Sequence, residues 1–152
     1  MQALLVFHNL LRWLILIFGI WTVIGFLSGL IGKRNYTSVN DRSNFLFMLS
    51  MDLQFVLGLI LYFLGSWFDR LKNMGETMKD ASLRFFTVEH AFMMILAWIL
   101  VHVGRVSVKK ATTPAGKFRR GLVFFGISLV LILIAIPWPF KPEVPRPWFR
   151  WF

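Results

Sequence analysis

The sequence of 152 residues contains no cysteine, and acidic residues are scarce, with seven Asp and Glu against seventeen Lys and Arg. The lack of cysteine excludes disulfide bonds, thiolate metal sites, iron–sulfur clusters and thiol nucleophiles. A P-loop, a GxGxxG motif and an HExxH motif are also missing, and no histidine is placed to activate Ser50, Ser66 or Ser128. Hydrolytic chemistry is therefore unsupported, and any cofactor must be held by ligands other than cysteine.

Charged residues of both signs make up only 16% of the chain, whereas 57% of the residues are hydrophobic and the mean hydropathy is +0.66. Seventeen Phe, seven Trp and seven Met supply more apolar surface than a small helical protein can hide from water. A bilayer accepts such a surface without cost. The composition predicts an integral membrane protein rather than a soluble domain.

The formal net charge of +10 would indicate a nucleic-acid partner if the protein were soluble. The basic residues, however, lie in the loops between apolar segments, as the positive-inside rule requires of a membrane protein. We therefore expect the lipid bilayer, and no nucleic acid, as a partner.

Four apolar segments are long enough to cross a bilayer as helices. They cover about residues 3–31, 44–68, 83–106 and 121–136. Asp41 or Ser43 is expected to cap the second helix, and Pro137 ends the fourth because proline has no amide hydrogen. The first segment has no basic residues before it and is too long for a cleaved secretory signal, so we expect it to remain in the mature protein. The predicted fold class is an all-α, four-helix transmembrane bundle over residues 1–140, with a tail over 141–152.

Basic residues are concentrated in the first and third loops, whereas the second loop mixes them with acidic residues. The residues concerned are Lys33, Arg34, Arg42, Arg105, Lys109, Lys110, Lys117, Arg119 and Arg120. Because loops rich in Lys and Arg stay in the cytoplasm, both termini are predicted to lie outside it. The expected location is a bacterial inner membrane.

Near the inner end of the first helix, Gly25 and Gly29 form a small-xxx-small pair, which predicts close approach of another helix.

The tail interleaves Trp148, Phe149, Trp151 and Phe152 with arginine and proline. Such a composition suits the lipid headgroup layer. Two interpretations remain open, an interfacial anchor and a docking strip for a partner subunit.

Ionisable side chains within apolar spans are costly and therefore tend to mark functional sites. This chain has six, namely His8, Arg12, Asp52, Glu89, His90 and His102.

His8 and His90 lie at similar predicted depths, each about five residues or slightly more below the outer start of its helix. Two imidazoles at one depth on two helices are the ligands that a hexacoordinate haem b requires. We therefore predict His8 and His90 as haem-iron ligands near the outer face. The other interpretation is that each histidine is only an interfacial or hydrogen-bonded residue.

Arg12 lies on the same helix face as His8, and Glu89 adjoins His90, so the sequence predicts that Arg12 and Glu89 meet across the first and third helices. An ion pair between them would remove most of the cost of insertion. The functional alternatives are that Arg12 holds a haem propionate or a quinone oxygen, and that Glu89 passes protons or hydrogen-bonds to His90.

His102 lies about 18 Å deeper than His90 on an ideal helix and on another face, so it cannot bind the same iron. It is predicted to be an interfacial histidine in contact with Asp52, and the two residues form a possible second site. Asp52 acts in this interpretation as a polar clamp between helices or as part of a proton or quinone path.

The chain resembles a group of small four-helix bacterial membrane proteins described as cytochrome b-like. The resemblance rests on His8-Asn-Leu-Leu-Arg12-Trp13, Gln54 with Gly58 and Tyr62, Arg84 through Glu89-His90, Gly104-Arg105, and Ile136-Pro-Trp-Pro. It covers nearly the whole chain and implies haem b and electron transfer with quinol. Better-understood four-helix cytochromes b carry two haems on four histidines, whereas this chain has three histidines and none in the fourth helix.

The sequence thus leads to one main hypothesis, a membrane cytochrome with a single haem that exchanges electrons with quinol or with a redox subunit of the respiratory chain. The alternative is a non-catalytic structural or accessory subunit of a larger inner-membrane complex. A third class, a carrier or channel for a small solute, would need a homo-oligomer to line a path.

Overall fold

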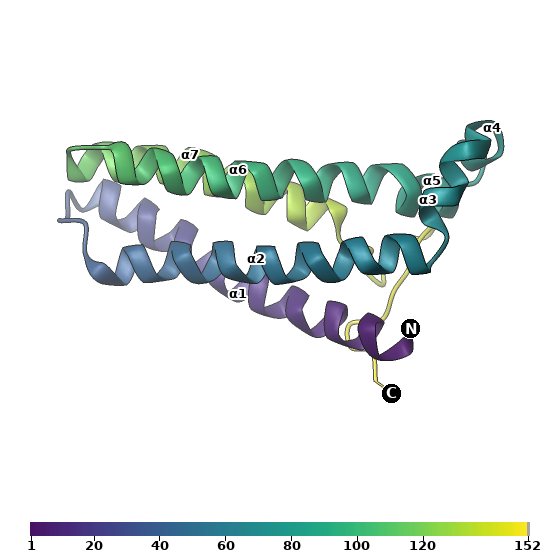
Figure 1. The fold of residues 1–152 in the computed structure, drawn as a ribbon. Helices are drawn as coiled ribbons and strands as arrows, with labels where there is room; N and C mark the ends of the chain where they lie inside the picture. The colour runs from purple at the N-terminus through teal and green to yellow at the C-terminus, as the bar shows by residue number, and fades with distance from the viewer. Residues whose placement is uncertain (152) are drawn as a thin grey trace.

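The computed structural model describes residues 1–151, and Phe152, the last residue of the predicted tail, lies outside the described residues. Four long helical segments run alternately up and down (Figure 1). They are α1 (Gln2–Ile31), α2 (Ser38–Leu64), the continuous run of α5 (Ala81–Arg84), the π-helix η2 (Phe85–Glu89) and α6 (His90–Lys110), and finally α7 (Pro114–Ala135). All four are long and apolar enough to cross a membrane, and residues 1–151 contain no strand.

The connection between α2 and α5 consists of three short elements, α3 (Trp67–Arg70), the 3-10 turn η1 (Leu71–Asn73) and α4 (Met74–Thr77). It lies at the same end of the bundle as both chain termini, which we call the termini end (Figure 1). The loops after α1 and after α6 lie at the opposite end, which we call the loop end.

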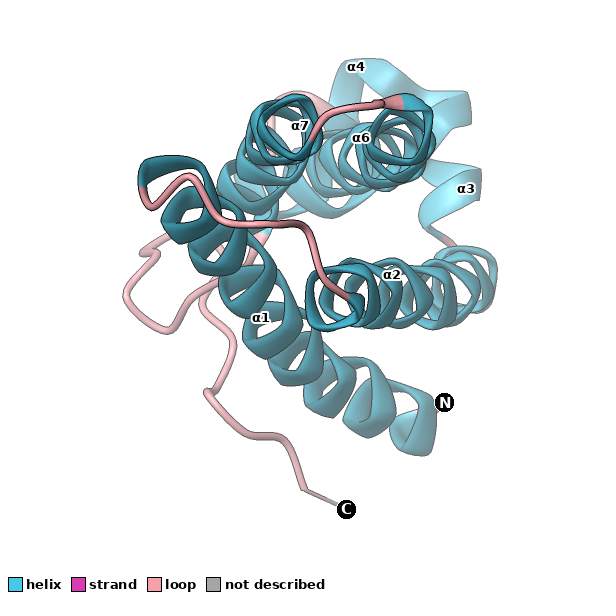
Figure 2. Cartoon of the chain, turned by 90° about the vertical axis from the view of Figure 1, so that its left-hand side faces the viewer, coloured by secondary structure: helices cyan, strands magenta, loops and turns pink. Residues whose placement is uncertain are grey.

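The helices form a ring in which α1 contacts α2 and α7, and α6 contacts the same two helices. As a result α1 and α6 face each other diagonally, as the view along the bundle shows (Figure 2). Toward the termini end α1 diverges from α6 and α7 (Figure 1). The chain after α7 returns to α1 there, where the Arg12 side chain donates to the carbonyl oxygen of Trp148 at 2.6 Å.

The second helix begins earlier than predicted because its cap is not Asp41 or Ser43. Thr37 takes the N-cap position in extended conformation, and Asn40 Oδ1 accepts a hydrogen bond from the Thr37 amide at 3.1 Å. The helix also ends at Leu64 rather than residue 68, since Ser66 adopts a left-handed conformation with φ of 59°.

The fourth helix likewise begins at Pro114 rather than residue 121. Thr113 Oγ1 accepts a hydrogen bond from the Gly116 amide at 3.1 Å. Pro114 suits the first helical position because it has no amide hydrogen that would lack a partner there. The third helical run extends over residues 81–110 instead of 83–106. The predicted bounds followed the apolar residues alone, whereas these helices continue past the apolar segment into charged turns.

Helices α1 and α7 approach closely through two reciprocal contacts between glycine and phenylalanine. A Cβ atom on Gly121 would lie 1.9 Å from Phe26 Cε1, and a Cβ atom on Gly29 would lie 2.4 Å from Phe118 Cε1. Phe26 is fully buried and Phe118 is 1% exposed. The predicted close approach at Gly29 is therefore present, whereas Gly25 has only an ordinary contact with Asn40.

Large apolar side chains cover the outside of the bundle as well as its core. Phe92 on α6, Ile24 on α1 and Val130 on α7 are each more than half exposed. An apolar exterior of this extent indicates a bilayer environment.

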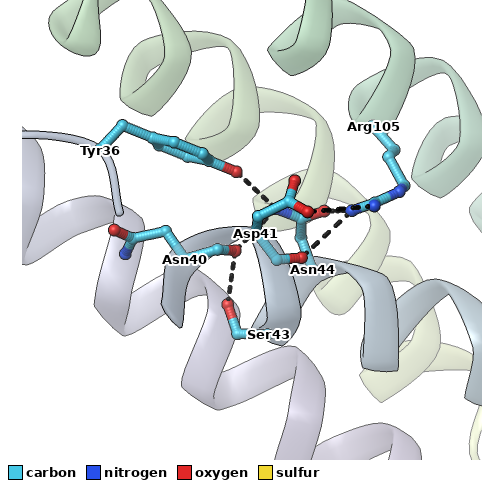
Figure 3. A network of polar contacts seen from close by, with 6 residues as sticks. All are labelled: Tyr36, Asn40, Asp41, Ser43, Asn44 and Arg105. Carbon is cyan, nitrogen blue, oxygen red and sulfur yellow. Dashed lines mark hydrogen bonds and ion pairs between the residues drawn. The ribbon is translucent and has the colours of Figure 1, made fainter. Parts of the chain in front are cut away.

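A polar cluster joins α2 to α6 at the loop end (Figure 3). Arg105, which is 9% exposed, donates to the Asn44 side chain and to the carbonyl oxygen of Asp41, the latter at 3.2 Å. Asn44 Nδ2 in turn donates to the Tyr36 hydroxyl at 2.8 Å. The buried guanidinium thus ties α6 both to α2 and to the loop that precedes it.

We predict that Gly121→Ala lowers the free energy of unfolding by about 1–3 kcal/mol, because the new methyl group overlaps the buried ring of Phe26. Gly126→Ala is the matched control on the same helix, since a Cβ atom there meets nothing within 4 Å. Denaturant unfolding in detergent micelles measures both. Equal stability of the two variants would contradict the packing described here.

A second prediction concerns Tyr36, whose pKa is raised to about 12, chiefly by burial. The folded protein holds this phenolic proton more tightly than the unfolded chain, so the contribution to stability is complete below about pH 10 and is lost as the pH rises through 12. The difference in unfolding free energy between wild type and Tyr36→Phe should therefore shrink over that interval. A difference that stays constant with pH would refute it.

Candidate functional site

A cavity of about 430 Å³ lies at the termini end, between α1, α2, α6 and the returning tail. Most of its wall is aromatic or aliphatic. The polar and aromatic lining residues are His8, Asn9, Arg12, Gln54, Phe55, Tyr62, Phe63, Trp67, Phe68, Phe86, His90, Trp98, Arg146 and Arg150. The predicted cofactor residues His8, Arg12 and His90 are among them, whereas Glu89 is not.

His8 and His90 project toward each other from the diagonal helices α1 and α6. Their ring centres are 6.4 Å apart, and the ring planes are inclined by 63°. The similar depth predicted from the sequence is therefore accompanied by a direct approach across the bundle, and both rings line the cavity.

The last turn of α7 fixes the orientation of the His90 ring. Its Nδ1 lies 2.9 Å from the carbonyl oxygen of Ala135. In a continuing helix this oxygen would accept from the residue four positions later, but that residue is Pro139, which has no amide hydrogen. Because a carbonyl oxygen only accepts, Nδ1 must carry the hydrogen, and the lone pair of the neutral ring is on Nε2.

His8 packs against α2, where Gly58 leaves room for its ring. A Cβ atom on Gly58 would lie 3.4 Å from His8 Cε1, and Gln54 Nε2 donates to the His8 carbonyl oxygen at 3.0 Å. The His8 Nδ1 atom is buried and has no hydrogen-bond partner. The ring is therefore held by packing and keeps a buried nitrogen that no other group engages.

The π-helix η2 immediately precedes His90 and was not predicted. Its wider turn brings residues five apart onto one face, and Arg84 Nε accordingly lies 2.7 Å from Glu89 Oε1. The Tyr62 hydroxyl on α2 donates to the carbonyl oxygen of Thr87 within this turn at 2.8 Å. Such turns are often found at functional sites, where they alter the direction of the following side chains.

The predicted contact between Arg12 and Glu89 is absent, because each side chain has another partner. Glu89 pairs with Arg84, and Arg12 donates to the carbonyl oxygen of Trp148 in the tail. Trp13 Nε1 donates to the same oxygen at 3.1 Å. Arg12 is 7% exposed, and its Nε atom is buried without a partner.

The predicted contact between Asp52 and His102 is present, with His102 Nε2 3.2 Å from Asp52 Oδ1. Trp98 Nε1 donates to the same oxygen at 2.7 Å. The Trp98 ring stacks on Phe55 with centres 4.7 Å apart, and both rings line the cavity. This clamp therefore links α2 to α6 directly beneath the cavity, while His102 stays outside it.

Three large side chains that precede or follow His90 on the same helical run, Phe86, Met94 and Trp98, also line the cavity. Two arginines of the tail, Arg146 and Arg150, were expected to lie at the membrane surface and were missed as site residues. No sequence pattern distinguishes them from anchoring residues, because only the return of the tail to α1 brings them to the cavity.

Residues 1–151 contain no group of three or more His, Asp or Glu side chains that could share a metal ion. The imidazoles of His8 and His90 are the pair that approach each other at the cavity.

Comparison of the chain with protein-family models, with curated proteins and with solved structures finds no match in any of the three. The function of the site must therefore be argued from its own geometry.

We predict that Asp52 and His102 are energetically coupled. A double-mutant cycle with Asp52→Ala and His102→Ala should give an interaction energy of about 0.6 kcal/mol, the average for hydrogen bonds between membrane helices, and no more than about 1.7 kcal/mol. Unfolding of the four proteins in detergent measures this energy. Additive effects of the two substitutions would mean that the contact adds no stability.

Proposed function

We propose that the chain is a membrane-bound b-type cytochrome that holds one haem between His8 and His90. The observation that supports this function best is the approach of the two rings, with centres 6.4 Å apart, across a cavity that both of them line. The proposal agrees with the resemblance of the chain to small cytochrome b-like membrane proteins.

The spacing of the two rings fits a single iron. Bonds from imidazole nitrogen to a metal are about 2.0 Å long, so two rings with centres 6.4 Å apart could both reach one iron between them. A porphyrin supplies four nitrogens of its own, so a six-coordinate iron needs only two protein ligands.

The surroundings of the rings fit the same group. A volume of about 430 Å³ lies within the range of roughly 300–1,000 Å³ that is usual for cofactor sites. The walls carry aromatic and thioether side chains. Gly58 and Ala91 have small side chains or none and therefore leave space beside the histidines. His90 donates a hydrogen bond from Nδ1 to the carbonyl oxygen of Ala135, and a contact of this kind usually orients a metal-binding histidine.

When bound, haem would supply reversible one-electron transfer, and the chain would determine how it is held. The Ala135 carbonyl fixes the orientation of the His90 ring. The apolar walls exclude water, and the packing of His8 against Gly58 sets the distance between the two ligands. The Asp52–Trp98–His102 clamp keeps α2 and α6 in register below the site.

The distribution of charge supports an orientation with the site near the outer face of a bacterial inner membrane. The basic loops lie at the loop end (Figure 1). The residues that line the cavity lie toward the termini end. By the positive-inside rule the loop end would face the cytoplasm. Quinol or a partner redox subunit is the proposed source or acceptor of electrons.

The experiment compares visible spectra of the purified wild type with those of His8→Ala and His90→Ala, after expression with sufficient haem. We expect the sharp reduced-minus-oxidised bands of low-spin haem b in the wild type and their loss in both variants. His102→Ala is the matched control, because His102 lies outside the cavity, and it should keep the bands.

A folded wild type that neither contains haem nor binds it when haem is added would overturn the proposal. The alternative of a non-catalytic subunit of a larger membrane complex would then remain. Bands that survive in either His8→Ala or His90→Ala would assign the iron to other ligands.

A further inference from the structure

Three arginine side chains line the cavity together, although they come from distant parts of the sequence. Arg12 lies on α1, and Arg146 and Arg150 lie in the tail. None of them forms an ion pair with an Asp or Glu side chain of residues 1–151. The four ion pairs of the described chain all involve other basic residues.

Backbone contacts hold the tail so that its arginines reach the cavity. The Arg146 amide donates to the carbonyl oxygen of Pro137 at 3.2 Å, and the Arg150 backbone lies beside the side-chain amide of Asn9 on α1. Between Arg146 and Arg150, the Trp148 carbonyl oxygen accepts hydrogen bonds from the side chains of Arg12 and Trp13. The guanidinium of Arg146 lies over the Phe86 ring, one turn before His90, at 4.7 Å.

This convergence of positive charge is electrostatically unfavourable without an anion. The pKa of Arg146 is lowered by burial and by the nearby charge of Arg150. Arg12 is nearly enclosed, and its Nε atom is a buried donor with no acceptor. A ligand with negative groups would satisfy these donors and offset the mutual repulsion.

A guanidinium binds carboxylate or phosphate through two parallel hydrogen bonds, and carboxylate is the anion that the ligand proposed above would supply. The macrocycle proposed above carries two flexible carboxylate arms on one edge. Arms directed toward α1 and the tail would meet Arg12, Arg146 and Arg150, while the ring lies between His8 and His90.

We propose that Arg12, Arg146 and Arg150 bind the carboxylate arms of a porphyrin and that this contact closes the C-terminal tail over the cavity. The inference rests on the proposed haem site and adds the class of ligand that the tail recognises, a tetrapyrrole with free acid groups. Since the ligand and the docked tail stabilise each other, each must strengthen the other by the same factor.

The test titrates the detergent-purified apoprotein with ferric protoporphyrin IX and with its dimethyl ester, in which both acid groups are blocked. Wild type should bind the free acid about tenfold or more tightly than the ester. In the variant Arg146→Gln with Arg150→Gln this preference should fall several-fold, and the part that remains should be due to Arg12. Lys141→Gln is the matched control, because Lys141 is a tail cation outside the cavity lining, and it should keep the wild-type preference.

Closure of the tail has its own measurement. Val144 is 4% exposed, and the chain has no native cysteine, so Val144→Cys reports opening of the tail through its rate of thiol labelling. The free acid should slow labelling several-fold, whereas the ester should leave it nearly unchanged. If the arginines had a purely structural role, their substitution would weaken the binding of the free acid and of the ester equally. The two porphyrins would then also have the same effect on the labelling rate.

The outcomes separate the two proposals. Wild type that binds both porphyrins equally well through His8 and His90 would overturn the role of the arginines and leave the haem site intact. An unchanged preference in the double variant would also overturn it. Wild type that binds neither porphyrin would overturn both proposals.

Discussion

A helix in a bilayer must satisfy every backbone polar group within the protein, and the end of α7 shows how the site follows from this constraint. Pro137 and Pro139 have no amide hydrogens, so the carbonyl oxygens of Leu133 and Ala135 lose their usual helical partners. Trp138 Nε1 donates to Leu133 at 2.8 Å, and His90 Nδ1 takes the oxygen of Ala135. The sequence that ends the helix therefore also fixes the tautomer of the histidine, and the chain that leaves α7 turns back toward α1.

The two ends of the bundle differ in packing: the loop end is closely packed, and the termini end contains the cavity. At the loop end, rings of Phe26 and Phe118 fill the space above glycines, and Arg105 joins α6 to α2 (Figure 3). Such close packing draws α1 and α7 together. At the termini end α1 diverges (Figure 1). The tail contributes Arg146, Pro147 and Arg150 to the wall of the cavity there. A rigid end with an open opposite end supplies the preorganised scaffold that a binding site needs.

Periodicity and length were sufficient to predict four helices and to place His8 and His90 at one depth, since both follow from the rise of an α-helix. The contact of His102 with Asp52 was also predicted. The predicted contact of Arg12 with Glu89 was wrong. The prediction assumed an unbroken α-helix, whereas the π-helix η2 brings Glu89 to Arg84. Helix starts were misplaced because caps lie in polar segments that hydropathy ignores. The place of the tail depends on contacts between residues more than a hundred positions apart, such as Arg12 and Trp148, and no local sequence pattern predicts such contacts.

The three histidines differ in the groups that surround them, and this difference separates a structural role from a ligand role. His102 has oxygen partners for both ring nitrogens, from Asp52 and from the Trp98 carbonyl. His90 has one partner, the Ala135 carbonyl, and its remaining nitrogen carries the lone pair. His8 keeps a buried nitrogen with no partner at all. An unsatisfied buried polar atom costs about 1–3 kcal/mol, so the unpartnered Nδ1 of His8, on a ring that faces His90 at the cavity, supports the proposal that a ligand binds between the two rings.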